Sequence, residues 1–225
     1  MQIVFVGQGG LDDLQALLGA GGMKKKNALT VVAFDGKEVC YERELKGETR
    51  IIENVATFSK DNQGFVVRGV ITNTHGHRRK SAIVAENGRI LGVSDMCNAI
   101  DGEVHSGAFL RVYDAKIGRV GVVVAQDVYD METIKTLAAC GCDFVVCPFD
   151  KVQDSTCTVL LRAYAFLCGV PIVFCGSDYA MIADVDATIA FASPISPIGV
   201  EFTVKKEFHL LEKRRRIYLK NKRAD

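Results

Sequence analysis

Short apolar runs rich in valine and isoleucine recur along the whole chain, and each is about as long as one β-strand. Turn residues or amphipathic segments separate them, which is the pattern of buried strands. So many buried strands require two sheets, or one large sheet, covered by helices. The runs are Gln2–Val6, Ala28–Phe34, Phe65–Ile71, Ser81–Ala85, Arg89–Val93, Phe109–Asp114, Arg119–Ala125, Phe144–Cys147, Pro171–Cys175, Asp186–Phe191 and Ile198–Val204.

Amphipathic segments lie between several of these runs and predict helices. Strands that alternate with helices usually pair in parallel, whereas the Asn87-Gly88 dipeptide predicts an antiparallel hairpin. No repeat or low-complexity linker divides the chain, so we expect one α/β domain with mixed sheets over residues 1–225. The expected helices are Leu11–Leu18, Glu48–Ser59, Met131–Ala139 and Ser155–Cys168.

Charge and hydropathy exclude several classes of protein. The 225 residues include 28 Lys+Arg and 27 Asp+Glu, and this balance argues against nucleic acid as a partner over the whole surface. A hydrophobic content of 48% excludes disorder. No apolar stretch is long enough to span a membrane, and Met1–Gly7 is too short for a signal peptide. We therefore expect a cytoplasmic protein.

The eight cysteines include no C-x-x-C pair, and several lie inside apolar runs. This usage favours reduced thiols that pack as small hydrophobic side chains. Cys140-x-Cys142 could form half of a metal site, but no second pair has a usual zinc spacing. We expect neither a cofactor nor a metal.

Two stretches, Gly118–Glu132 and Gly141–Pro148, carry the most specific pattern in the chain. Together they spell a glycine turn, a valine strand ending at Ala125, a tight turn, a helix, a glycine stop and a strand closing with proline. This order resembles the signature of the nitrilase, or carbon–nitrogen hydrolase, superfamily. The resemblance is weaker but extends to Met1–Gly7, Ala28–Asp35, Asn87–Gly92 and Leu161–Val173.

The resemblance implies a four-layer α-β-β-α sandwich and a Glu–Lys–Cys triad. In that family the thiolate attacks an amide or nitrile carbon, the glutamate is the general base, and the lysine stabilises developing charge. The corresponding positions here are Asp35 for the base, Met96 or a neighbour for the lysine, and Ala125 for the nucleophile. A further family glutamate falls near Leu167. The triad is therefore degenerate, which implies a nitrilase-like fold without hydrolase activity that could bind a small ligand or a partner.

Two motif acids remain, Asp127 and Glu132, and the resemblance gives them a role in shaping the turn. An alternative is a carbon–nitrogen hydrolase with a relocated cysteine nucleophile. Three thiols fall where family strands open onto the pocket, and Asp35 could serve as their base. They are Cys97, Cys147 and Cys175.

Two polar segments offer other functions. The segment 203–225 has nine basic and three acidic residues, so it could be an interaction module for RNA, anionic lipid or a protein, or simply a solvated end of the chain. His75 and His77 could share a metal ion on a strand, but Gly76 between them favours a polar turn.

Self-association is the expected partnership. The resemblance implies pairing through Met131–Ala139 and Ser155–Cys168, and the second segment is apolar on nearly all sides, with Arg162 its only charged residue. Such a helix is normally buried on more than one side, so we expect a homodimer or a higher homo-oligomer. The alternative is a monomer whose C-terminal segment covers the apolar surface.

Overall fold

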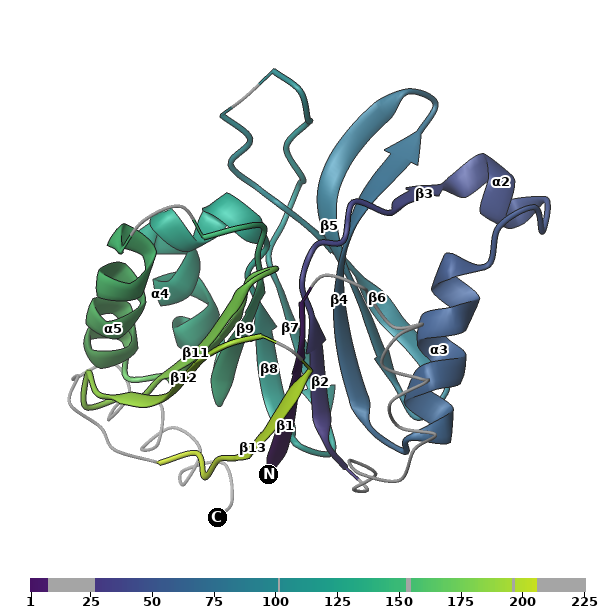
Figure 1. Cartoon of the computed structure of the whole chain (residues 1–225). Coiled ribbons are helices and arrows are strands. Elements are labelled where there is room, and N and C mark those ends of the chain that lie inside the picture. The colour runs from purple at the N-terminus through teal and green to yellow at the C-terminus, as the bar shows by residue number, and fades with distance from the viewer. Residues whose placement is uncertain (8–26, 101, 153–154, 196, 206–225) are drawn as a thin grey trace, which may run out of the picture.

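Two β-sheets face each other in the middle of the molecule, and helices cover the outer face of each (Figure 1). The computed structural model describes residues 1–7, 27–100, 102–152, 155–195 and 197–205. The predicted four-layer α-β-β-α sandwich with mixed sheets is confirmed. The predicted helix Leu11–Leu18 and most of the basic segment, from residue 206 onward, lie outside the described residues.

The first sheet has seven described strands and is mixed. Its centre is parallel, and its two ends are closed by antiparallel partners. In spatial order the strands are β13 (Ile198–Glu201), β1 (Gln2–Val6), β2 (Leu29–Val32), β4 (Phe65–Thr74), β5 (His77–Glu86) and β6 (Arg89–Asp95), with β3 (Glu38–Cys40) also paired to β4.

The second sheet follows the same plan with six described strands. Its three central strands are parallel and its outer strands are antiparallel. In order they are β12 (Ile189–Pro194), β11 (Tyr179–Ala183), β10 (Ile172–Cys175), β9 (Phe144–Pro148), β8 (Gly118–Val122) and β7 (Arg111–Ala115).

The tight turns agree with the sequence. Asn87 and Gly88 both have positive φ, 49° and 90°, and join β5 to β6 as the predicted hairpin. His75 and Gly76 form the turn between β4 and β5, and His77 is the first residue of β5. The polar turn predicted at this position is confirmed.

The helices divide between the two outer layers. Helix α3 covers the first sheet, while α4 and α5 lie side by side over the second (Figure 1). Asp130 caps α4 by accepting a hydrogen bond from the backbone N–H of Glu132. Ser155 occupies the cap position of α5, but its side chain makes no capping bond. The bounds are α2 (Tyr41–Leu45), α3 (Ile51–Asp61), a 3₁₀ helix η1 (Ala125–Tyr129), α4 (Met131–Ala139) and α5 (Thr156–Cys168).

The main core lies between the sheets and is built from the inward side chains of both. Two smaller clusters lie under the helices. Backbone bonds connect the segments after the parallel strands: Phe34 N–H donates to Phe149 O at 3.2 Å, and Phe149 N–H donates to Cys175 O at 2.8 Å. The carboxyl ends of β2, β9 and β10 therefore meet at one place. Within the described part of the chain, no helix has the length and apolar character needed to cross a membrane.

Candidate functional site

Ala125, at the predicted nucleophile position, lies at a sharp turn where the chain leaves β8 and enters η1. Its φ is 48°, in the left-handed region, and the residue is completely buried. A non-glycine residue in this conformation costs on the order of 1–3 kcal/mol. The backbone at this turn is thus held in an uncommon shape, and the side chain that it carries is a methyl group with no polar atom.

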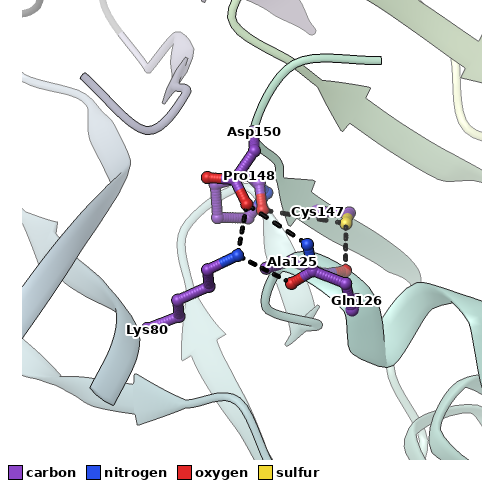
Figure 2. Close-up of polar contacts among 6 residues, drawn as sticks. All are labelled: Lys80, Ala125, Gln126, Cys147, Pro148 and Asp150. Carbon is purple, nitrogen blue, oxygen red and sulfur yellow. Dashed lines mark hydrogen bonds and ion pairs between the residues drawn. The ribbon is translucent and has the colours of Figure 1, made fainter. Parts of the chain in front are cut away.

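A lysine reaches this turn from the other sheet. Lys80, on β5, donates from Nζ to Gln126 Oε1 at 3.0 Å and to Asp150 Oδ2 at 2.5 Å. Gln126 Nε2 also donates to Asp150 Oδ2, at 3.3 Å. Figure 2 shows these three side chains converging beside Ala125. Gln126, the residue after Ala125, is therefore hydrogen-bonded both to Asp150 in the segment after β9 and to Lys80 of the first sheet.

Met96, at the predicted lysine position, is buried in the same core cluster as Ala125. Its backbone N–H donates to the carbonyl oxygen of Lys80 at 2.8 Å. The positive charge near the turn thus comes from Lys80, which pairs with the Met96 segment. Sequence reasoning did not identify Lys80, which directly precedes the buried apolar run Ser81–Ala85.

Asp35, at the predicted base position, forms a buried ion pair with Arg68. Arg68 Nη2 lies 2.7 Å from Asp35 Oδ2, and the two side chains are only 4% and 5% exposed. The other carboxylate oxygen of Asp35 accepts the backbone N–H of Lys37. In the described chain, no hydrogen bond or ion pair joins Asp35 to Ala125 or to Met96. The acid position is therefore occupied by a carboxylate already bound to a cation.

The three candidate thiols lie in environments that favour the neutral form. Burial, with the carboxylates of Asp127 and Asp95 as further causes, raises the pKa of Cys97 to about 11. Burial also raises the pKa of Cys175 to about 12, and raises that of Cys147 well above its usual value. Activated cysteine nucleophiles have lowered pKa values instead.

The positions of the two deepest thiols explain this. Cys147 Sγ lies 4.0 Å from the carbonyl oxygen of Ala125, beside the turn (Figure 2). Cys175 Sγ lies within hydrogen-bond distance of the carbonyl oxygens of Val6 and Val31, at 3.5 and 3.4 Å, and its one S–H can donate to either. Both thiols are completely buried in the core, and burial disfavours the charged thiolate.

Asp127 fixes the loop that follows β6. Its carboxylate accepts the backbone N–H groups of Cys97 and Asn98, at 2.6 and 2.8 Å, although the residue is almost completely buried. Burial raises the pKa of Asp127, and these two hydrogen bonds offset part of the rise. The sequence assigned this acid to the turn that contains it, and the structure shows its carboxylate bound to the loop after β6.

A pocket of about 440 Å³ opens where the carboxyl ends of β2, β9 and β10 meet. This position is typical of ligand sites in sheets with parallel strands. Two of the lining residues, Asp35 and Asp150, are the acids that pair with Arg68 and Lys80 as described above. Sequence reasoning did not identify the pocket residues beyond Asp35, because nothing in their spacing brings them together. The lining residues are Phe34, Asp35, Gly36, Ile71, Asp150, Lys151 and Ser177.

Comparison with known proteins yields structural matches only. No protein-family model matches the sequence, and no curated relative does. One match is an amidase from Nesterenkonia sp. AN1, solved as a cysteine-to-alanine variant in complex with butyramide. Its TM-score is 0.73 at 15% sequence identity, and the match covers 99% of this chain and 96% of that chain. Nit3 from Saccharomyces cerevisiae, a member of branch 10 of the nitrilase superfamily, matches with a TM-score of 0.72 at 14% identity, over 88% of each chain.

These identities establish the fold alone. Another structure of the Nesterenkonia amidase carries a covalent adduct of fluoroacetamide at its active-site cysteine. The resemblance drawn from Gly118–Glu132 and Gly141–Pro148 is thus confirmed for the architecture, since the matching structures are nitrilase-superfamily proteins.

Proposed function

We propose that this chain, which has the fold of the nitrilase superfamily, does not hydrolyse carbon–nitrogen bonds and instead binds a small ligand in its pocket. Ala125 carries the proposal. Covalent catalysis by this fold needs a thiolate at the turn after β8, and a methyl group cannot attack a carbonyl carbon.

The other two triad positions support the same conclusion. Met96 supplies no charge, and Asp35 is bound to Arg68 rather than directed at Ala125. Lys80 is the cation near the turn, but its ammonium group is held by Asp150 and Gln126. A general base that is free to take a proton is therefore lacking among the described residues around Ala125.

A hydrolase with a relocated thiol is the competing function. The raised pKa values of Cys97, Cys147 and Cys175 argue against it, because the thiolate is the reactive form. For Cys97, a pKa raised to about 11 means that the thiolate is a still smaller minority at neutral pH than for an ordinary cysteine.

Ammonia release from butyramide and from N-carbamoyl compounds tests the proposal. We expect no turnover by the protein, with the Nesterenkonia amidase as the active control. The variant Ala125→Cys should gain little activity, because position 96 still lacks a charge and Asp35 is still paired. Turnover by the unmodified protein that disappears when Cys97, Cys147 or Cys175 is changed to serine would establish the relocated nucleophile instead. Intact-mass labelling with iodoacetamide at neutral pH gives a second readout, in which the exposed Cys140 should react before the partly exposed Cys97 and the buried Cys147 and Cys175.

We also propose that the chain forms a homodimer through α4 and α5. Three large apolar side chains of α5, Val159, Phe166 and Leu167, are exposed on the outer layer. Tyr129 in η1 and Met131 at the start of α4 are also exposed. One self-complementary patch of this kind can be covered by a second copy through a two-fold axis.

Light scattering at micromolar concentration tests the dimer. We expect a mass of twice the 24.5 kDa of one chain, and we expect Leu167→Glu to shift the protein towards the single-chain mass. A charge placed in the centre of an apolar interface is desolvated without a partner, which is strongly unfavourable. The matched control is Leu45→Glu, because Leu45 is also an exposed leucine but lies on α2. A mass of 24.5 kDa that persists as concentration rises would contradict the proposal.

A further inference from the structure

We infer that the pocket at the carboxyl ends of β2, β9 and β10 selects a small organic carboxylate with a short apolar body, over the neutral amide of the same shape. The inference rests on the proposed function, because it requires that the pocket hold a ligand without converting it. It extends that function by assigning the chemical class of the ligand to residues that lie outside the degenerate triad.

The two acids that line the pocket are already neutralised. Asp35 is paired with Arg68, and Asp150 accepts hydrogen bonds from Lys80 and Gln126. Each carboxylate has its own cation within 2.7 Å. The pocket therefore does not need a cationic ligand to balance these acids.

Lys151 leaves one positive charge at the pocket that no described acid neutralises. It lines the pocket beside Asp150, and its ammonium group makes no ion pair or hydrogen bond with any other described residue. The charged side chains at the pocket and in its two ion pairs are therefore two carboxylates, Asp35 and Asp150, and three cations, Arg68, Lys80 and Lys151. An anionic group in the pocket would complete this arrangement.

Ser177 adds a donor in the same pocket. The residue is only 7% exposed, and its hydroxyl has no hydrogen-bond partner among the described residues. Its backbone N–H donates to Asp150 O at 3.0 Å, which fixes the residue against the wall. A buried hydroxyl without a partner is unfavourable, so an acceptor oxygen from a ligand would stabilise it. A carboxylate can accept from this hydroxyl while its charge faces Lys151.

The remaining wall fits a short apolar body. Phe34 and Ile71 line the pocket, and Phe34 is held in place because its ring packs against Gly69, where a Cβ atom would lie 2.8 Å from the ring. A volume of about 440 Å³ is near the lower end of the usual range for small-molecule sites. These features match a ligand with one charged end and one small apolar end.

Benzoate, benzamide and benzamidinium test the inference, because the three have nearly the same shape and carry negative, zero and positive charge. We expect NMR titration to give the tightest binding for benzoate, about fivefold or more above benzamide, with benzamidinium weakest.

Lys151→Gln should remove that preference, whereas Lys116→Gln, in the turn between β7 and β8, should keep it. Equal binding of benzoate and benzamide, stronger binding of benzamidinium, or no binding of benzoate at millimolar concentration would each overturn the inference.

The variant Ser177→Ala tests whether the Ser177 hydroxyl contacts the ligand or only supports the folded structure. Removing a buried hydroxyl without a partner should leave the melting temperature of the free protein unchanged or raise it, while benzoate binds several-fold more weakly. Weaker binding together with a lower melting temperature of the free protein, or unchanged binding, would count against the contact. Ammonia release from benzamide is followed in the same samples. Hydrolysis there would refute the proposed function, whereas failure to bind benzoate would refute only the ligand class.

Discussion

Replacement of Arg68 by alanine is expected to lower the free energy of unfolding by about 3–5 kcal/mol. The change leaves the carboxylate of Asp35 buried without its cation, and an uncompensated buried charge is strongly destabilising. For a chain of this size the melting temperature should fall by about 6–20 °C. Urea denaturation followed by circular dichroism measures the effect.

Arg43→Ala provides the matched control. Arg43 also pairs with a carboxylate, that of Glu48, but the two side chains are 59% and 51% exposed. Exposed ion pairs contribute about 0–1 kcal/mol, so this variant should be close to the parent protein. The double variant Arg68→Met with Asp35→Asn should recover part of the loss, because neither charge is then buried alone. Equal effects of Arg68→Ala and Arg43→Ala would contradict the importance of burial here.

Replacement of Asp127 by alanine is expected to lower the free energy of unfolding by about 2–5 kcal/mol. The change removes the buried acceptor of two partly buried hydrogen bonds, from the backbone N–H groups of Cys97 and Asn98, and hydrogen bonds to a charged group contribute about 1.5–3 kcal/mol each. The loop after β6 should also lose its fixed position beside η1. Urea denaturation gives the free energy, and hydrogen exchange at those two amides gives the local effect.

Two variants control the Asp127 experiment. Asp127→Asn keeps one acceptor oxygen, so its loss should be smaller than that of Asp127→Ala. Asp114→Ala removes an aspartate whose side chain is 82% exposed, and it should change the free energy of unfolding by less than about 1 kcal/mol. A loss of stability from Asp127→Ala no greater than that from Asp114→Ala would show that the two N–H bonds contribute little.

Helices and strands could be predicted from the sequence where the hydrophobic pattern agrees with the residues that begin and end the element. Helix α4 has the predicted bounds Met131–Ala139, because Asp130 caps its start and Gly141 follows its end with a φ of 95°. Strand β11 was missed, because Tyr179–Ala183 carries no alternation and follows another buried run after only a short turn. Helix α2 was also missed, since its five residues bury none of their side chains.

The site could be predicted only where a motif is local. The turn at Ala125 and the acid at Asp127 lie within the one stretch whose order of elements is specific. The partnership of Lys80 with Asp150 joins residues 70 positions apart, and the pair Asp35–Arg68 joins residues 33 positions apart. Such contacts depend on which strands pair within a sheet and on how the two sheets pack, so no spacing in the sequence reveals them. Ser177 was missed for the same reason.

The backbone bond from Phe34 to Phe149 has a consequence for how ligand binding and unfolding are coupled. It joins the segment after β2 of one sheet to the segment after β9 of the other, and the pocket is lined from both sides of this junction. A ligand seated there touches both layers of the sandwich, so separating the layers would require its release. Its binding would then add to the stability of the sandwich as a whole, and occupancy of one small pocket would raise the free energy of unfolding of the entire molecule.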